Sequence, residues 1–161
     1  MHTKTLILSY GNVDRQDDGV AWHVLKQVAT LLHLPPPEDA GKGFWEASEN
    51  VDFIFQLQLT PELAETVALY DQVVFIDAHT GNVPQEIHLE AVDPVFTTSP
   101  FTHHMTAAAC MYLVSSLYRA KTRAILVSIR GYEFGFSEEL SPRTAALVQP
   151  AAEKIIDWLN H

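Results

Sequence analysis

The sequence predicts an α/β fold: a single three-layer α/β/α domain, residues 1–161, with a mostly parallel, twisted sheet of about five strands. Short runs rich in branched apolar residues alternate along the chain with segments that have helical spacing. The connections between successive strands are long enough for right-handed crossovers. No internal repeat or linker marks a second domain, and 161 residues with 47% apolar side chains suffice for one core.

The predicted strands differ in how their apolar residues are arranged. Residues 5–9 form a branched apolar run with the length of a buried strand. Residues 72–79 contain a continuous apolar run closed by Asp77, which is typical of a central parallel strand covered on both faces. Residues 86–92 alternate polar with apolar side chains and predict an edge or half-exposed strand. Two further strands are expected at 51–57 and 124–129.

The predicted helices are marked by caps and by proline. The first runs from about residue 18 to 33 and ends before three consecutive prolines. A short helix follows Thr60, which offers an N-cap, with Pro61 at the first helical position. Others are expected from about 105 to 118 and from Ser141, again followed by proline, through Leu159.

Residues 35–50 interrupt this alternation and are predicted to form an exposed connection. They contain three prolines, and Phe44 and Trp45 lie among polar residues. These two aromatic residues are interpreted either as buried anchors or as part of a partner surface.

Composition limits the classes of partner and compartment. Ten Lys and Arg against twenty Asp and Glu give a formal net charge of −10, which disfavours nucleic acid and favours a neutral, basic or cationic partner. The single cysteine, Cys110, has no internal disulfide partner and is expected to be a small core residue. The sequence shows neither a signal-peptide pattern nor an apolar run long enough to span a bilayer. It therefore predicts a cytoplasmic protein without a membrane span.

Several common catalytic signatures are absent from the sequence. It contains no Gly-x-Ser-x-Gly elbow, His-Glu-x-x-His helix, Gly-x-Gly-x-x-Gly loop or phosphate-binding Gly-Lys-Ser/Thr loop. A serine or thiol acyl-enzyme mechanism therefore has no support in the sequence.

The turn 11–19 is the first candidate functional element, because it lies at the carboxyl end of the first strand, where open α/β sheets bind ligands. It contains two adjacent acids, Asp17 and Asp18. In a purely structural interpretation, Asp17 is the N-cap of the following helix and Asp18 a first-turn anion stabilised by the helix dipole.

Two further side chains are expected at the same edge of the sheet. Asp77 ends the central strand, and His103 opens a helix after a long loop. If the sheet is doubly wound, both converge with Asp18. Two carboxylates and an imidazole suit a divalent transition ion such as nickel or zinc, with positions left open for substrate or water. His104 follows His103 directly, and only one of the two rings is expected to face the site.

The chain resembles the hydrogenase maturation protease family, endopeptidases that trim the C-terminal extension of the nickel-iron hydrogenase large subunit after nickel insertion. The residues that carry the resemblance are, in order, Gly11-Asn12, Asp17-Asp18-Gly19, Asp77-Ala78, His103-His104, Gly131-Tyr132-Glu133-Phe134-Gly135 and Leu140-Ser141-Pro142. The chain departs from the family pattern around the expected substrate groove, where Asp14-Arg15 and Ala21 replace an apolar residue and a glycine.

The resemblance implies a metal-dependent endopeptidase with Asp18, Asp77 and His103 as metal-binding and catalytic residues. Nickel is then the recognition element, supplied by the partner, a hydrogenase large-subunit precursor. A one-residue shift in alignment would exchange His103 for His104.

For the chemical step, the positions of two further residues suggest roles. Asp17, if it is not bound to metal, is a candidate to accept a proton from the attacking water. Asn12, or a backbone amide near Gly11, is a candidate to stabilise the oxyanion.

Two other functions are compatible with the same residues. One is a non-catalytic metallochaperone or assembly checkpoint that binds a nickel-loaded partner without cutting it. The other is a small-ligand α/β binding domain whose carboxylates hold a ribose or another polar ligand.

Overall fold

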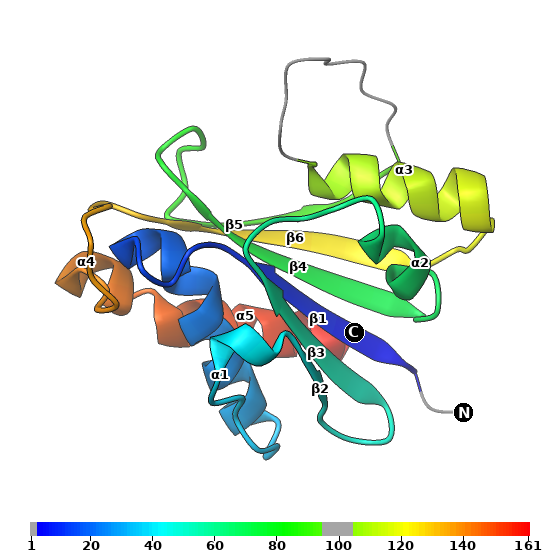
Figure 1. Ribbon diagram of the computed structural model, residues 1–161, viewed down its shortest axis with the longest axis horizontal. Helices are drawn as coiled ribbons and strands as arrows, with labels where there is room; N and C mark the ends of the chain where they lie inside the picture. The colour runs from blue at the N-terminus through cyan, green and yellow to red at the C-terminus, as the bar shows by residue number, and fades with distance from the viewer. Residues whose placement is uncertain (1–2, 95–104) are drawn as a thin grey trace.

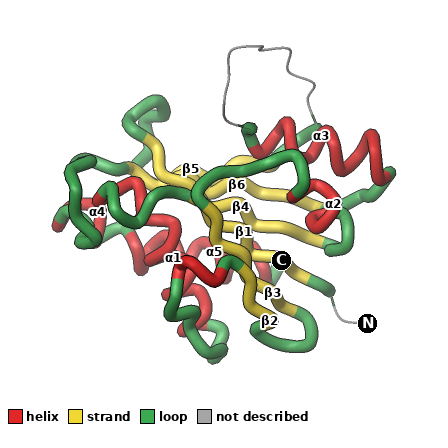
Figure 2. Tube along the Cα trace, viewed as in Figure 1, coloured by secondary structure: helices red, strands yellow, loops and turns green. Residues whose placement is uncertain are grey.

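The computed structural model describes residues 3–94 and 105–161. These residues form a six-stranded sheet between two layers of helices (Figures 1 and 2). The strands are β1 (Thr5–Tyr10), β2 (Phe44–Glu46), β3 (Val51–Gln56), β4 (Gln72–His79), β5 (Ile87–Ala91) and β6 (Arg123–Arg130). Their order across the sheet is β2-β3-β1-β4-β6-β5. The predicted α/β class is confirmed, with one strand more than expected.

The four inner strands are parallel, and both edge strands are antiparallel to their neighbours. β1 pairs in parallel with β3 and β4, and β4 pairs in parallel with β6. β2 and β5 run antiparallel to β3 and β6. The edge position predicted for residues 86–92 is therefore confirmed by β5. Because β1 and β4 are parallel neighbours, the segments that follow Tyr10 and His79 leave the sheet at the same edge.

The helices begin and end close to the predicted positions, with two differences. They are α1 (Val20–Leu31), α2 (Leu63–Val67), α3 (Ala107–Tyr118), α4 (Pro142–Ala145) and α5 (Val148–Leu159), with 3-10 turns at Gln16–Gly19 and Ala40–Lys42. The first helix starts with a 3-10 turn, so that Asp18 lies before α1. The predicted C-terminal helix is divided into α4 and α5. Pro150 has no N–H to donate, and it lies in the first turn of α5, where a helix does not need that donor.

Each face of the sheet contributes to its own apolar core. Ile7 of β1 packs with α1 and α5, while Leu6 and Leu8 pack with α2 and α3. This alternation follows from the period of two along a strand. Figure 1 shows the two helical layers on opposite sides of the sheet. Cys110 is fully buried in the second core and burial raises its pKa to about 11, as expected for a structural cysteine.

Residues 44–46 of the expected exposed connection form the edge strand β2, in which Phe44 and Glu46 are exposed as predicted. Trp45 is half-buried, and its ring lies 5.7 Å from that of Trp22 in α1. Trp22 also contacts Phe55 of β3, with ring centroids 5.0 Å apart. Trp45 is thus a half-buried anchor, whereas Phe44 stays 40% exposed.

Within the described part of the chain, every helix is too short or too polar to cross a membrane.

Candidate functional site

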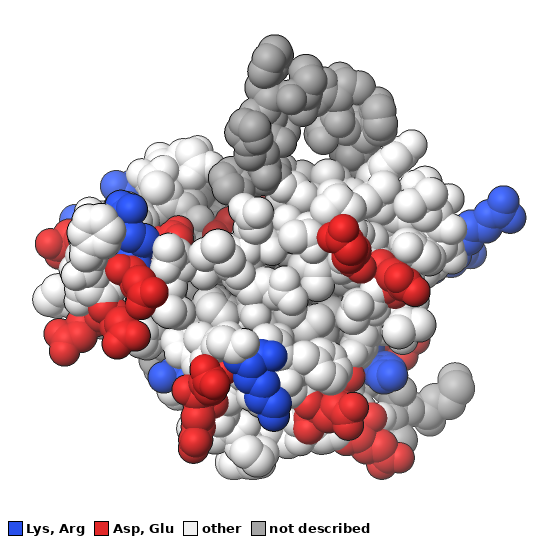
Figure 3. Space-filling view, viewed as in Figure 1, with Lys and Arg blue, Asp and Glu red and all other residues white. Residues whose placement is uncertain are grey.

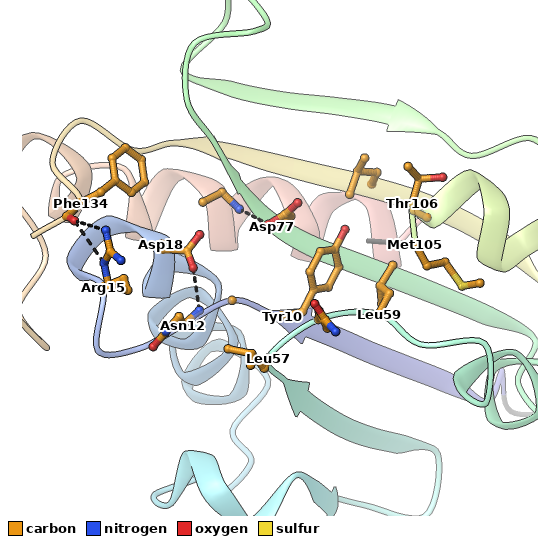
Figure 4. Close-up of a pocket in the computed structure, with 15 residues that line it drawn as sticks. Tyr10, Asn12, Arg15, Asp18, Leu57, Leu59, Asp77, Met105, Thr106 and Phe134 are labelled. Atoms are coloured by element: carbon orange, nitrogen blue, oxygen red, sulfur yellow. Dashed lines mark hydrogen bonds between the residues drawn. The ribbon is translucent and has the colours of Figure 1, made fainter. Parts of the chain in front are cut away.

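A cavity of about 930 Å³ lies at the carboxyl ends of β1 and β4 (Figure 4). Its wall comes from the turn after β1, from residues 57–59 after β3, from the end of β4 and from residues 105–107 at the start of α3. Asp18 and Asp77 both line it. The structure therefore brings these two predicted site residues together, although they are 59 positions apart in the sequence.

The Asp77 carboxyl group is the more buried of the two. Its Oδ1 accepts the Ala78 N–H at 2.7 Å, and its carboxyl group also hydrogen bonds with the Tyr10 hydroxyl. The pKa of Asp77 is raised to about 7, because burial and, to a smaller extent, the Asp18 charge outweigh the hydrogen bonds from Ala78 and Tyr10, which lower it. Asp77 therefore changes its charge near neutral pH.

Tyr10 is a site residue that the sequence analysis missed. It is the last residue of β1 and lines the cavity. Burial, together with the Asp77 charge, raises the pKa of Tyr10, so its hydroxyl stays protonated and remains a hydrogen-bond donor. The sequence of β1 did indicate this position. Tyr10 lies on the same strand face as Leu6 and Leu8, and it places a polar hydroxyl at the carboxyl end of that otherwise apolar face.

Asp18 is held by the turn that precedes it. Its Oδ2 accepts the backbone N–H of Asn12 at 2.9 Å. This close return of the chain requires glycine at position 11, where φ is 150° and a Cβ would lie 2.2 Å from the Asp18 carbonyl oxygen. Asn12 lines the cavity, and its Oδ1 accepts the N–H of Asp14 at 2.9 Å. Its role towards an oxyanion stays a prediction.

Asp17 has a structural position that the sequence analysis did not anticipate. It is 0% exposed, and its carboxylate accepts five hydrogen bonds from residues 132–144. The donors are the N–H groups of Tyr132 (2.8 Å), Glu133 (2.9 Å) and Ser141 (2.8 Å) and the hydroxyls of Ser141 (2.6 Å) and Thr144 (2.8 Å). The carboxylate thus joins the turn after β1 to the segment before α4 and to α4 itself.

Two expectations for Asp17 were therefore wrong. It is not an N-cap, since Arg15 and Gly19 occupy the cap positions of the 3-10 turn and of α1. It is also a poor proton acceptor for water, because it is absent from the cavity wall and fully buried. Burial opposes ionisation of Asp17, but the hydrogen bonds from Ser141, Glu133 and Tyr132 together hold its pKa below the ordinary value.

The predicted imidazole ligand cannot be placed, because His103 and His104 lie outside the described residues. Met105, two positions after His103, lines the cavity. Among residues 3–94 and 105–161, no three His, Cys, Asp or Glu side chains form a group that could hold a metal ion. The described part of the site therefore supplies two carboxylate groups.

The remaining wall of the cavity is largely apolar. Leu57, Leu59, Met105 and Leu126 line it, and Leu57 is 66% exposed. In the space-filling view, uncharged side chains cover much of the visible surface, and charged side chains are scattered around and between them (Figure 3). Such a cavity offers a neutral peptide segment apolar contacts beside a pair of acids.

Three solved structures show the same fold as this chain. HycI of Thermococcus kodakarensis, a [NiFe] hydrogenase maturation protease, is 19% identical and has a TM-score of 0.67, with 99% of this chain and 94% of that chain covered. The hydrogenase maturating endopeptidase HybD of E. coli is 18% identical with a TM-score of 0.71, covering 98% and 92%. A hydrogenase 2 maturation peptidase from a Thaumarchaeota archaeon is 16% identical with a TM-score of 0.62, covering 97% of each chain.

Comparison of the sequence itself adds no relative, because no family profile and no curated protein matches it. At the identities above, the structural likeness defines the fold. The chain therefore has the fold of the hydrogenase maturation proteases along nearly its whole length.

Proposed function

We propose that the protein is an endopeptidase that removes the C-terminal extension of a nickel-iron hydrogenase large-subunit precursor after nickel insertion. The observation that carries this proposal is the placement of Asp18 and Asp77 in one open cavity at the carboxyl edge of the sheet. The fold shared with HycI and HybD, both named for hydrogenase maturation, supports the reaction class. We place the reaction in the cytoplasm, as the single cysteine without a disulfide partner predicts.

The donor set suits nickel that arrives as part of the substrate. Carboxylate oxygens bind divalent ions, and a cation between Asp18 and Asp77 would offset both the burial of the Asp77 charge and the repulsion from Asp18, which together raise the pKa of Asp77. His103 is proposed as a third ligand, since the chain reaches the cavity wall two residues later. The ligands of the substrate would complete the coordination. Binding requires ionised carboxylates, so affinity is expected to fall as pH decreases below about 7.

The remaining steps are assigned to residues of the cavity. A bound nickel ion would polarise the scissile carbonyl or the attacking water. With Asp17 buried, the proton of that water passes to one of the two cavity carboxylates. The side-chain amide of Asn12 is proposed to donate to the developing oxyanion. The backbone is a weaker candidate, because the N–H groups of Gly11 and Asn12 already donate to the Gln56 carbonyl oxygen and the Asp18 carboxylate. The apolar wall around Leu59 and Met105 would hold the polypeptide on either side of the bond.

The proposal is tested by incubating the protein with a nickel-loaded large-subunit precursor and measuring the mass of the precursor. We expect the wild-type protein to release a C-terminal peptide and the Asp18→Asn variant to lose at least about a hundredfold in rate. Asp157→Asn, which changes an exposed acid on α5, is the matched control and should retain the wild-type rate.

Other outcomes of this experiment identify the alternatives. Stable binding of the loaded precursor without any loss of mass would show an assembly checkpoint instead of a protease. Failure to bind the precursor, together with ligand binding that persists in a chelator, would indicate a small-ligand binding domain.

A further inference from the structure

Arg15 occupies a distinctive position beside the two carboxylates. Of the described residues that line the cavity, it alone is positively charged. Figure 4 shows its side chain at the Asp18 end of the cavity, next to Phe134. Neither Asp18 nor Asp77 forms an ion pair with it, and no carboxylate among residues 3–94 and 105–161 lies within 4 Å of its guanidinium. In a protein with twice as many acids as bases, such an unpaired arginine at the site requires an explanation.

The Arg15 side chain is exposed, and its guanidinium contacts neutral groups. Its Nε and Nη2 donate to the carbonyl oxygen of Phe134, at 3.3 and 3.0 Å. Its central carbon lies 4.8 Å from the ring centre of Phe136, which is 90% exposed. These contacts leave Nη1 without a hydrogen-bond partner in the described part of the chain. An arginine held by neutral partners keeps its full charge available for an anion.

The backbone around Arg15 is also fixed. Gln16 has a positive φ of 53°, an uncommon conformation for a residue with a side chain. Its N–H donates to the carbonyl oxygen of Ser137 at 2.8 Å, and its Oε1 accepts the N–H of Gly135 at 3.1 Å. Together with the hydrogen bonds of Asp17, these contacts join the Arg15 turn to residues 132–144. The position of Arg15 at the cavity rim is therefore set by the fold.

We propose that Arg15 binds a carboxylate of the C-terminal segment of the precursor, and that it thereby positions this segment across Asp18 and Asp77. This inference rests on the proposed function and adds a specificity residue to it. A planar guanidinium matches a carboxylate better than an ammonium does, because it offers paired N–H donors. The carboxylate has two possible sources, the free C-terminus of the precursor and an acidic side chain within its extension.

The test compares Arg15→Gln, Arg15→Lys and wild-type protein on the nickel-loaded precursor. Two readouts are used. One is the affinity for the precursor, and the other is the KM and kcat of its cleavage, which is followed by its loss of mass. We expect Arg15→Gln to raise KM about tenfold with kcat changed less than about twofold, because the contact binds substrate without touching the reacting bond. Arg15→Lys should recover part of the loss, since it restores the charge but not the planar donor pair.

Arg143→Gln is the matched control for this series. Arg143 is exposed and also lies over an aromatic ring, with its guanidinium carbon 3.9 Å from the centre of the Tyr132 ring. It is absent from the cavity wall. The control removes a comparable charge and ring contact, and it should leave KM and kcat at the wild-type values.

Two altered precursors distinguish the sources of the carboxylate. In one, the C-terminus is amidated by ligation; in the other, the acids of the extension are replaced by their amides. One of these precursors lacks the carboxylate that Arg15 binds. On that precursor, the KM of the wild-type protein should be about tenfold higher than on the unaltered precursor, and Arg15→Gln should have the same KM as wild type.

Two results would overturn the role of Arg15. One is an unchanged KM for Arg15→Gln. The other is a rise in KM that is equally large for all precursors, which would show that the residue acts through protein structure. The affinity readout separates this inference from the proposed function. A wild-type protein that binds without cutting still reports on Arg15, and one that neither binds nor cuts contradicts both proposals.

Discussion

Asp77→Asn is expected to stop processing of the precursor while it makes the folded protein more stable above pH 7. The activity should fall by more than about a hundredfold, because asparagine cannot supply a negative ligand or accept the proton of the attacking water. The structural contacts of residue 77 survive the change. An asparagine Oδ1 can still accept the Ala78 N–H, and its side chain can still pair with the Tyr10 hydroxyl.

The gain in stability follows from the direction of the pKa shift. Burial raises the pKa of Asp77 from 3.8 to about 7 in the folded state. Between these values the folded protein binds more protons than the unfolded chain, so the wild-type stability falls as pH rises through this window. The shift corresponds to at most about 4 kcal/mol. Asp77→Asn avoids this loss and should raise the free energy of unfolding at pH 8 by about 2–4 kcal/mol.

Urea unfolding of both proteins between pH 4 and pH 8 measures this effect. The difference in the free energy of unfolding should be near zero at pH 4 and reach its full size by pH 8. Asp157→Asn should show no such pH-dependent gain. If Asp77→Asn is less stable than wild type by the same amount at every pH, the contacts of Asp77 stabilise the fold and its buried charge does not destabilise it.

Asp17→Ala is expected to destabilise the protein by about 4 kcal/mol, the largest loss for any single acid described here. The substitution leaves three N–H groups and the Ser141 hydroxyl without their acceptor in a site that is closed to solvent, while the Thr144 hydroxyl can still donate to the Arg130 carbonyl oxygen at 3.0 Å. Asp17→Asn should lose less, because its one remaining oxygen can replace Oδ2, which accepts four of the five hydrogen bonds.

The pH dependence of Asp17 is opposite to that of Asp77. Its pKa is lowered in the folded state, so its contribution to stability is present above the unfolded value of 3.8 and is lost as pH falls through the folded value.

Thermal or urea unfolding at pH 7 measures the loss of stability in Asp17→Ala. The control is Asp14→Ala, which changes an exposed acid. A loss for Asp17→Ala no greater than that for Asp14→Ala would show that the five hydrogen bonds do not hold the two segments together.

The convergence of Asp18 and Asp77 was predictable because parallel strands bring their carboxyl ends to one edge. The branched run of β1 and the continuous apolar run of β4 were enough to identify two parallel strands of the sheet. Because β1 and β4 pair in parallel, Asp18, which follows β1, and Asp77, near the end of β4, lie close together. The roles of both acids as ligands stay predictions, as does the role of His103.

The function of Asp17 was not predictable from local pattern. Its partners Ser141 and Thr144 lie 124 and 127 positions later in the chain. Adjacent acids before a helix are equally consistent with capping, and no periodicity links such distant residues. The hydrogen bonds between Asp17 and Ser141 link two separate motifs of the sequence, since the Asp17 carboxylate accepts the N–H and the hydroxyl of Ser141.

The short strand β2 was missed for a different reason. With three residues, from Phe44 to Glu46, it is too short to show an alternating pattern, and it lies among prolines and glycines that indicate a loop. Its place in the sheet depends on tertiary contacts, namely pairing with β3 and the packing of Trp45 on Trp22.

The proposed site depends on Asp18 and Asp77 acting on each other across one cavity. Carbon-13 NMR titration of the Asp77 carboxyl group, in wild type and in Asp18→Asn, measures that interaction directly. We predict a pKa of about 7 in the wild-type protein and a lower pKa in the variant, because a neighbouring negative charge has been removed. A pKa of Asp77 that stays the same when Asp18 is neutralised would contradict a shared site.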